Sequence, residues 1–229
     1  MIRVFVGYDP REAVVFHVCV QSLVKYSSRP LAITPLALNN LAEIYQEDHV
    51  DGTNAFTYSR FLVPFLCGFE GQAIYIDGDM VVRGDISELV GYLSPGKDIA
   101  VVKHEYETVA CRKYFGTDNR NYPRKNWSSV IVWDCSSAFN SRLTPEFVRT
   151  HDGAYLHQFK WLLSNDRIGE LPQDWNWLAG EYLNNDSAKL YHYTLGSPCF
   201  PEYASCQHAD AWWRDFNEMI VPIEATDDI

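Results

Sequence analysis

The sequence is short of three features that would place it in other classes of protein. No run of apolar residues approaches the roughly 20 that a membrane-spanning helix needs. Met1 is followed at once by the short apolar run 2–6, without the basic, extended leader of a secretory signal. Lys and Arg number 19 against 30 Asp and Glu, and the formal net charge of −11 disfavours nucleic acid or an anionic membrane as a partner. We therefore expect a cytoplasmic protein with no nucleic-acid partner and no membrane span.

Cysteine is present, but not in the patterns that indicate a disulfide framework or a zinc site. The 6 Cys form no Cys-x-x-Cys pair and have no His-Cys zinc spacing. They are typical of small buried residues in a reduced, intracellular protein. The sequence also has no repeat, low-complexity segment or obvious linker, so its 229 residues predict a single domain, 1–229. A hydrophobic content of 47% and an aromatic content of 14% predict a well-packed core.

Short apolar runs alternate with stretches of helical spacing along the chain. Asp9 and Pro10 suit an N-cap and a first helical residue, so a helix should follow the first strand and end near Tyr26. The alternation predicts an open α/β sheet, mainly parallel in its first half, whose ligands bind at the carboxyl ends of the strands. The expected strands are 2–6, 31–38, 73–76, 98–103, 127–133 and 189–193, and the expected helical segments are 10–26, 55–67, 86–92, 136–163 and 210–219.

The most informative segment places two carboxylates at the end of a predicted strand. Residues 73–76 are uncharged and largely β-branched or aromatic, which is typical of a buried strand. Asp77 and Asp79 follow it, and side chains two apart in an extended chain point to the same side. Gly78 between them has no side chain, so a ligand could approach the backbone there. Paired oxygen ligands suit Mn²⁺ or Mg²⁺, which would share a diphosphate with the protein. The alternative is a polar loop after a strand.

Six motifs in a fixed order resemble those of GT-A fold glycosyltransferases, most closely the retaining family 8 enzymes, which include glycogenin-like and bacterial galactosyl- and glucosyltransferases. The family carries a Y-x-R helix, a Y-[IL]-D-x-D strand end and a G-D-[IL]-x-x-L continuation. These are followed by an N-[SA]-G-V strand, an L-P-x-x-[WF]-N turn and an H-[FY]-x-G-x-x-K-P closing loop. The corresponding segments here are 57–64, 74–82, 84–89, 126–133, 171–176 and 191–198, so the resemblance extends from residue 2 to about residue 198.

The resemblance implies a GT-A fold, an α/β/α sandwich with a mainly parallel central sheet. It also implies a metal-dependent transfer of a hexose from a UDP-sugar to an acceptor hydroxyl, with retention of configuration. Residues 1–105 would form the nucleotide-sugar-binding half, and residues 106–229 the acceptor-side half with the closing C-terminal segment. The glycan, lipid or protein acceptor is not identified by the sequence.

The resemblance also assigns roles to individual residues. Asp79 and His192 would ligate Mn²⁺, and Asp77 would contact both the metal and the ribose. Arg60 would reach the donor sugar or phosphate, and Gln158 would lie beside the reacting sugar carbon. The remaining implied donor contacts are Tyr8 and Asp9 on the uracil, the Gly196 N–H on the diphosphate, and Gly7, Tyr58, Gly78, Asn126 and Ser197.

Three positions differ from the family pattern. The family's Asp-Gln pair is His157-Gln158 here, so the carboxylate that contacts the donor hydroxyls is missing or supplied elsewhere. Ser197-Pro198 stands where the closing loop has Lys-Pro, so the lysine that pairs with the diphosphate has no equivalent. Trp127 occupies the position of a usual Asn. These differences leave the donor sugar open.

The chemistry of the transfer fits these residue types. Charge accumulates on the leaving diphosphate, and a divalent ion neutralises it without a protein acid. The carboxamide of Gln158 carries no charge for a nucleophilic attack. We therefore expect a same-face displacement in which the departing phosphate helps to deprotonate the acceptor.

Several of these residues also fit a structural role. Arg60 could form a buried ion pair with Asp77 or Asp85, and Asp9 could serve only as the N-cap. His192 could be a half-buried strand residue, and Gln158 could lie on a helix surface. Trp175, Asn176 and Trp177 could line an acceptor site by stacking on sugar faces, although core packing is the alternative for tryptophan.

Three other functions compete with this prediction. A haloacid-dehalogenase-type phosphatase would use Asp77 as the nucleophile and Asp79 as the acid/base. A non-catalytic sugar-nucleotide or glycan-binding module would keep the fold without turnover. An inverting GT-A enzyme would need a carboxylate general base, for which the candidates are Asp152, Asp166 and Asp174.

Overall fold

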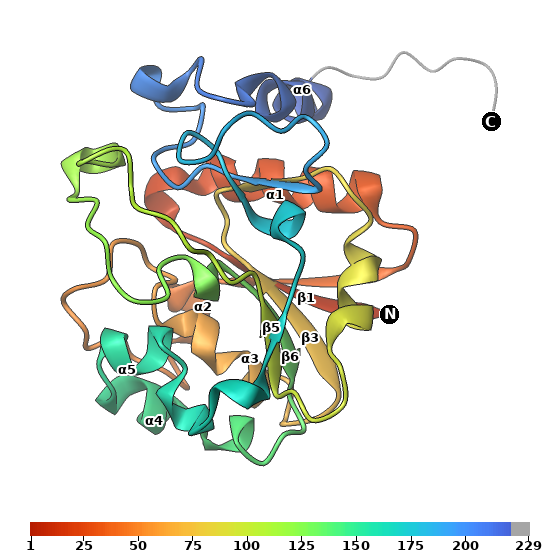
Figure 1. Cartoon of the computed structure of the whole chain (residues 1–229), viewed down its shortest axis with the longest axis vertical. Helices are drawn as coiled ribbons and strands as arrows, with labels where there is room; N and C mark the ends of the chain where they lie inside the picture. The colour runs from red at the N-terminus through yellow and green to blue at the C-terminus, as the bar shows by residue number, and fades with distance from the viewer. Residues whose placement is uncertain (221–229) are drawn as a thin grey trace.

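A six-stranded sheet forms the centre of the molecule (Figure 1). The structure is a computed structural model that describes residues 1–220; residues 221–229 of the expected domain lie outside the described part. The strands lie side by side in the order β2-β1-β3-β6-β5-β7. Their bounds are β1 Ile2–Gly7, β2 Leu31–Leu36, β3 Gln72–Ile76, β5 Ile99–Val101, β6 Val130–Asp134 and β7 Ile168–Glu170.

The sheet is mainly parallel, which confirms the expected fold class. β1 pairs in parallel with both β2 and β3, and β5 pairs in parallel with β7. β6 alone among these six strands runs the other way, antiparallel to β3 and to β5. The chain leaves β1 toward β2 and returns on the other side of β1 as β3. The switch in strand order therefore lies between β1 and β3, where open α/β sheets bind ligands.

A second sheet of three strands begins with β4, which follows β3 along the chain. It is ordered β4-β9-β8, with β4 at Met80–Val82, β8 at Trp177–Leu178 and β9 at Leu190–His192. β4 and β9 are antiparallel, and Met80 lies opposite His192. This pairing brings residues more than a hundred positions apart next to the carboxyl end of β3.

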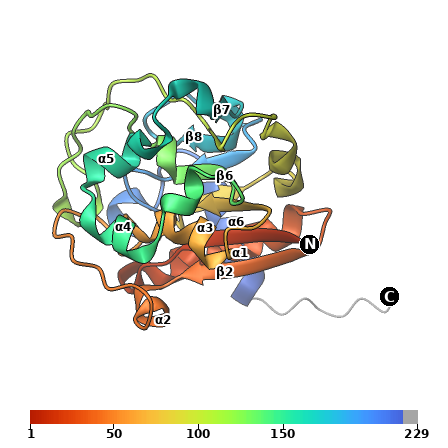
Figure 2. The same cartoon turned by 90° about the horizontal axis from the view of Figure 1, so that it is seen from below.

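Helices cover both faces of the central sheet (Figure 1, Figure 2). On one side α1 (Ala13–Tyr26) packs on β1 and β4, and α6 (Ala209–Ile220) packs on α1. Asp9 caps the turn before α1, as expected, by accepting from the Arg11 N–H at 2.9 Å. The other side carries the short helices α3 (Val63–Leu66), α4 (Pro145–Thr150) and α5 (Gly153–His157), with α2 (Leu38–Leu41) after β2.

The helical segments are shorter and more interrupted than expected. The 55–67 segment begins as turns, continues as a 3-10 helix at Ser59–Leu62 and ends in α3. The 136–163 segment is divided into α4, α5 and 3-10 turns, because Asp152 caps a new helix through the Tyr155 N–H at 2.7 Å. Trp127–Ser129 is a 3-10 turn before β6, so the strand expected from residue 127 begins later.

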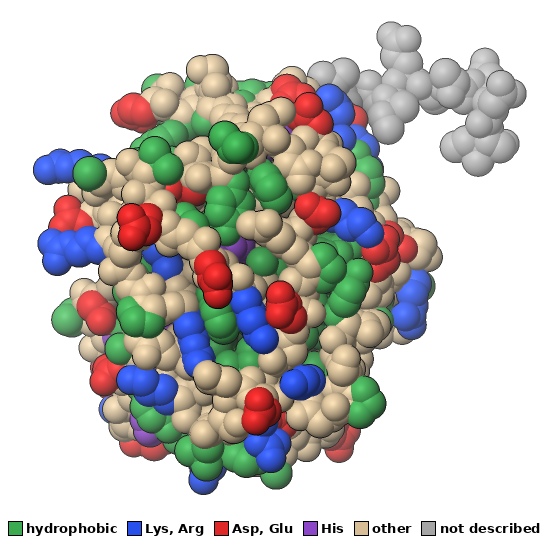
Figure 3. Space-filling view, in the orientation of Figure 1, with side chains coloured by type: hydrophobic (Ala, Val, Ile, Leu, Met, Phe, Trp, Pro, Cys, Tyr) green, Lys and Arg blue, Asp and Glu red, His purple; other side chains and the backbone are tan. Residues whose placement is uncertain are grey.

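Two further expectations concern the cysteines and the membrane. All six cysteines are free, but only Cys19 and Cys135 are buried and Cys111 is exposed, which corrects the expectation of uniformly buried residues. Among residues 1–220, none of the helices combines the length and apolarity needed to cross a bilayer. On the face shown in Figure 3, acidic and basic side chains are interspersed, without a broad area of one sign.

Candidate functional site

The site is built on the connection between β3 and β4. Asp77 is fixed on the central sheet by its N–H, which donates to the Ser129 carbonyl at 3.0 Å. Gly78 packs so tightly that a Cβ there would lie 2.3 Å from the carbonyl oxygen of Gly7. The end of β1 therefore fills the space beside Gly78, and the glycine is required for this packing.

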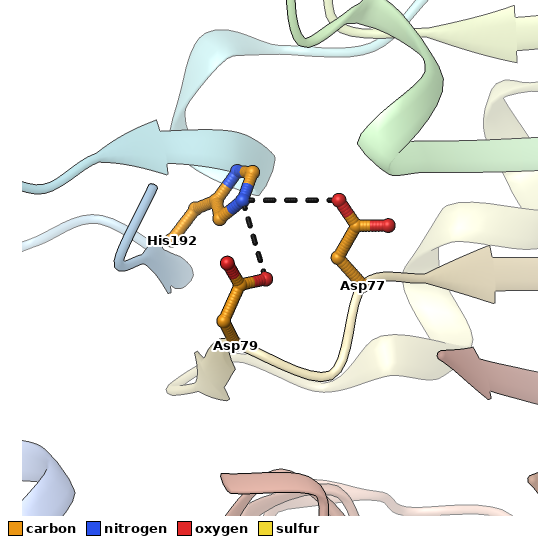
Figure 4. Close-up of side chains that lie close together, drawn as sticks. All are labelled: Asp77, Asp79 and His192. Carbon is orange, nitrogen blue, oxygen red and sulfur yellow. Dashed lines mark ion pairs between the residues drawn. The ribbon is translucent and has the colours of Figure 1, made fainter. Parts of the chain in front are cut away.

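Asp77, Asp79 and His192 form a buried cluster at this connection (Figure 4). Nε2 of His192 lies 3.4 Å from Oδ1 of Asp79 and 3.9 Å from Oδ2 of Asp77. Their potential ligand atoms all lie within 4.8 Å of one another. Oδ1 of Asp79 is buried and has no hydrogen-bond partner within the described chain. Two carboxylates and an imidazole are a fitting ligand set for Mn²⁺ or Mg²⁺, and the unpartnered oxygen suits a metal ligand.

The two carboxylates have different electrostatic surroundings. Burial raises the pKa of Asp77, although the neighbouring Arg60 opposes this effect. Burial would also raise the pKa of Asp79, but the neighbouring His192 outweighs it and the pKa is lowered. Arg60 is itself buried and its Nη1 lies 2.9 Å from Oδ1 of Asp77. The arginine thus forms the ion pair with Asp77 that was the structural alternative to a ligand-binding role.

Asn176 holds His192 from the side opposite the aspartates. Its Oδ1 lies 2.9 Å from Nδ1 of His192, and its Nδ2 donates to Ser129 Oγ at 2.8 Å. Asn176 is fully buried behind the cluster and belongs to the interior here, not to an exposed acceptor surface. A donor hydrogen bond from Nδ1 leaves the lone pair of Nε2 free to bind a metal.

The cluster opens into a cavity of about 320 Å³. Its wall brings together seven of the sequence-predicted residues from both halves of the chain. These are Tyr58, Arg60, Asp77, Asp79, Asn126, Gln158 and His192. The wall also includes Asp51, Gly153, Ala154 and His157. We refer to the part of the wall that Asp77, Asp79 and His192 form as the metal-binding end of the cavity.

His157 contributes a neutral imidazole to the cavity wall. Its Nδ1 lies 2.7 Å from Oγ of Ser128, which also lines the cavity. Burial, followed by the charge of Arg60, lowers the pKa of His157 to about 3. The imidazole is therefore uncharged at neutral pH, whereas a carboxylate at this position would carry a charge. Gln158 follows directly, at the C-terminal end of α5.

Other predicted site residues lie outside the cavity wall of the described chain. The Asp9 carboxylate accepts hydrogen bonds from the Ala55 N–H at 3.0 Å and from Arg11. The Gly196 N–H donates to the Tyr193 carbonyl at 3.0 Å. Trp175 is fully buried in the core, and the indole N–H of Trp177 donates to the Leu183 carbonyl. Gly7, Tyr8, Gly78 and Ser197 are also absent from the part of the wall that the structure describes.

The segment between β5 and β6 supplies wall residues that the sequence analysis missed. Lys113, Tyr114, Thr117 and Tyr122 come from this stretch and face the cavity. Its course from residue 102 to residue 129 is irregular apart from short 3-10 turns and an isolated bridge between Arg112 and Asp118. The length of this connection could have indicated that it carries site residues, because long irregular connections in compact domains are often functional.

A comparison of sequences found a similar protein. Protein CDI of Arabidopsis thaliana is 38% identical over 224 residues, which cover 94% of this chain and 86% of that protein. No family model matches the sequence.

The fold is similar to those of solved glycosyltransferases. The bifunctional glycosyltransferase WbbM superposes with a TM-score of 0.67 at 16% identity, over 94% of this chain but only 49% of WbbM, so the chain spans about half its length. The galactosyltransferase LgtC, solved with donor and acceptor sugar analogues, gives 0.60 at 11% identity over 97% of this chain and 98% of its own. GlyE of Streptococcus pneumoniae gives 0.60 at 15% identity over 99% of this chain and 67% of its own. These likenesses confirm the GT-A glycosyltransferase fold.

Proposed function

Because this chain belongs to the family of Protein CDI of Arabidopsis thaliana and has the GT-A glycosyltransferase fold, we propose that it is a metal-dependent hexosyltransferase. Its donor would be a UDP-linked hexose and its acceptor a hydroxyl group, with retention of configuration, as in glycosyltransferase family 8. The observation that carries the proposal is the buried cluster of Asp77, Asp79 and His192 at the wall of a cavity.

The three side chains of the cluster would hold Mn²⁺ or Mg²⁺ together with the donor diphosphate. A bound divalent ion would neutralise the charge that develops on the leaving diphosphate. Asn176 orients His192, and Arg60 pairs with Asp77 and opposes the rise in its pKa that burial causes. The cluster is largely excluded from solvent, which strengthens each of these electrostatic interactions.

In the transfer, the bond between the anomeric carbon and the phosphate oxygen breaks, and its electron pair stays on the oxygen. The acceptor oxygen forms the new bond to the carbon, and its proton passes to the departing phosphate. Gln158, at the cavity wall, would lie beside the anomeric carbon and shield its positive charge without attacking it. Asp152, Asp166 and Asp174, the candidate bases for inversion, lie outside the described cavity wall, which favours retention.

The remaining donor contacts belong to the same proposal. Tyr58 and Asn126 face the cavity and would contact the donor. A uracil contact from Asp9 would compete with the bond from the Ala55 N–H, and a diphosphate contact from Gly196 would compete with its bond to Tyr193. Trp177 is half-buried and is the remaining candidate of the Trp175–Trp177 segment for acceptor stacking.

A binding module without turnover is the second candidate. It is favoured by the neutral His157 at the position where the family has a carboxylate, and by the ion pair that already occupies Asp77. The phosphatase alternative finds no such support, since the fold matches glycosyltransferases.

Calorimetric titration of UDP with Mn²⁺, and then with the metal chelated, tests the proposal. We expect UDP to bind only with Mn²⁺, and Asp79→Asn to abolish binding while Asp174→Asn, outside the cavity, retains it. A screen of UDP-sugars for donor consumption follows, and the anomeric configuration of the product tests retention. Binding without any donor consumption would favour the binding module, whereas absence of UDP binding would overturn the UDP assignment.

A further inference from the structure

Lys113 is a cationic wall residue of the 102–129 connection, and the proposed function does not yet include it. It lines the same cavity as the metal-binding cluster. The protein carries a formal net charge of −11 and concentrates two carboxylates at this end of the cavity. A donor diphosphate is itself anionic and needs positive charge beyond a single divalent ion. The closing segment offers none, because Ser197 and Pro198 stand where a lysine would be expected.

The backbone around Lys113 is docked against that same closing segment. The N–H of Tyr114 donates to the Leu195 carbonyl at 2.7 Å, and the Lys113 N–H donates to the Thr117 carbonyl at 2.8 Å. The Tyr114 ring stacks on Phe200 with centroids 5.3 Å apart. The Tyr114 hydroxyl also donates to Oε1 of Glu12 at 3.3 Å, so the turn is held from two sides.

Lys113 lines the same cavity as the carboxylates of Asp77 and Asp79, and it forms no ion pair within the described residues. Within residues 1–220, no carboxylate oxygen lies within 4.0 Å of its ammonium. Burial lowers the pKa of Lys113, and the nearby charges of Asp79, Glu181 and Asp77, in that order, oppose the effect. Lys113 is half-buried and lines the cavity, so its ammonium is available to an anionic ligand that enters there.

The other cations near the cavity are already engaged. Arg60 pairs with Asp77 and donates to the Ser128 carbonyl. Lys125 donates to Oδ1 of Asn119 at 2.5 Å and lies over the rings of Tyr106 and Tyr122. Among the lysines of this connection, Lys113 is the one that lines the cavity.

We propose that Lys113 binds the diphosphate of the donor at the metal-binding end of the cavity. The inference rests on the proposed function and makes it more specific. The closing segment lacks the lysine that would pair with the diphosphate, and Lys113 in the 102–129 connection would supply that positive charge instead. Lys113 would hold the nucleoside diphosphate both before transfer and after it, as the leaving group.

The test compares four proteins loaded with Mn²⁺: the wild type, Lys113→Met, Lys113→Arg and the matched control Lys103→Met. Lys103 forms a surface ion pair with Glu170, so its substitution removes the same charge elsewhere. We expect Lys113→Met to weaken UDP binding by about 10- to 100-fold, the range of a charge-assisted hydrogen bond. Lys113→Arg should recover most of the loss, and Lys103→Met should bind as the wild type does.

UMP serves as the second ligand. A direct contact with the diphosphate predicts a larger loss for UDP than for UMP in Lys113→Met, whereas displacement of the whole connection would weaken both ligands alike. Equal losses, or unchanged UDP binding in Lys113→Met, would overturn the assignment to Lys113 while the proposed function stands.

Failure of the proposed function gives a different result. If the wild type does not bind UDP, the same four proteins are titrated with ADP, GDP, CDP and dTDP. Lys113-dependent binding of one of these would support the diphosphate contact and overturn only the uridine assignment. Absence of binding by all five diphosphates would overturn both the proposed function and the role of Lys113.

Discussion

The Asn176 side chain holds the imidazole of His192 at Nδ1, while Nε2 of the same ring faces Asp79. The two contacts are 2.9 Å and 3.4 Å long and lie on opposite sides of the ring. Metal-binding histidines commonly donate their second ring N–H to such a partner, which fixes the tautomer and the ring orientation. Asn176 is therefore a positioning residue for the metal-binding cluster.

We expect Asn176→Ala to lower the affinity for Mn²⁺ by about 10- to 100-fold, the usual effect of removing such a partner. The ring of His192 would lose its fixed orientation, and Ser129 Oγ would lose the hydrogen bond from Asn176. The measurement is a titration of the protein with Mn²⁺, followed by the electron paramagnetic resonance signal of the free ion.

Asn140→Ala is the matched control for this substitution. Asn140 is also fully buried, and its Nδ2 donates to the carbonyls of Asp98 and Asp134, away from the metal-binding cluster. Both variants should lower the melting temperature, but only Asn176→Ala should lower metal affinity. Equal Mn²⁺ affinity in the two variants would show that Asn176 does not position His192.

The buried ion pair between Arg60 and Asp77 gives a prediction for the metal-free protein. Arg60→Met should lower the free energy of unfolding by about 3–5 kcal/mol, because it leaves a buried carboxylate without its partner. The double variant Arg60→Met, Asp77→Asn should recover much of this loss. Urea denaturation of the single and double variants measures the coupling.

Arg149→Met provides the comparison with an exposed pair. Arg149 contacts Asp48 and Glu146 at the surface, where water screens the charges, so its loss should have little effect. An equally small loss of unfolding free energy in Arg60→Met and Arg149→Met would show that the ion pair with Asp77 does not stabilise the protein. A double variant no more stable than Arg60→Met would show the same.

The position of β3 along the chain and the two aspartates that follow it could be predicted from local sequence pattern. The apolar segment before Asp77 is uncharged, and the carboxylates follow it two residues apart, so the signal lies within a few neighbouring residues. His192 could be placed at the cluster only through the resemblance to a family. Its position opposite Met80 depends on the pairing of β4 with β9, which no local pattern encodes.

The roles of Asn176 and Lys113 could not be predicted for the same reason. Asn176 lies next to Trp175 in a segment that suits sugar stacking, and only its tertiary contacts show that it faces His192 from the interior. Lys113 lies in an irregular connection whose position is set by Leu195 and Phe200, far away in the sequence. The 136–163 segment was predicted as mostly helical because its spacing did not reveal the new N-cap at Asp152.

Gly78 should not tolerate a side chain, because the Gly7 carbonyl is a rigid backbone group. A Cβ at residue 78 would approach it to 2.3 Å, which forces the connection between β3 and β4 away from β1. Gly78→Ala should therefore lower both the melting temperature and the Mn²⁺ affinity. Thermal unfolding with and without Mn²⁺ measures both effects.

Gly91→Ala is the control for this substitution. A Cβ at residue 91, within the 3-10 helix Ile86–Tyr92, would meet no atom within 4 Å. This variant should bind Mn²⁺ as the wild type does and should keep or slightly raise its melting temperature. A Gly78→Ala variant with unchanged Mn²⁺ affinity would show that the connection can shift without disturbing the cluster.

Glu12 should make the stability of the metal-free protein depend on pH. Burial, followed by the charges of Asp79 and Asp9, raises its pKa from 4.5 to about 8, while Tyr114 and Arg11 oppose the rise. The folded protein thus retains a proton on Glu12 that the unfolded chain releases above pH 4.5. The stabilisation that comes from this raised pKa is complete below pH 4.5 and is lost as the pH rises through about 8.

Glu12→Gln removes this pH dependence, because the amide stays neutral and can still accept from the Tyr114 hydroxyl. We expect the variant to gain roughly 2–5 kcal/mol of unfolding free energy relative to the wild type between pH 5 and pH 8. Other titrating groups contribute equally to both proteins, so they cancel in the difference. Urea denaturation at several pH values in the presence of a chelator provides the two curves. Parallel curves from pH 5 to pH 8 would show that Glu12 is ionised in the folded protein and that Tyr114 packs against a charged carboxylate.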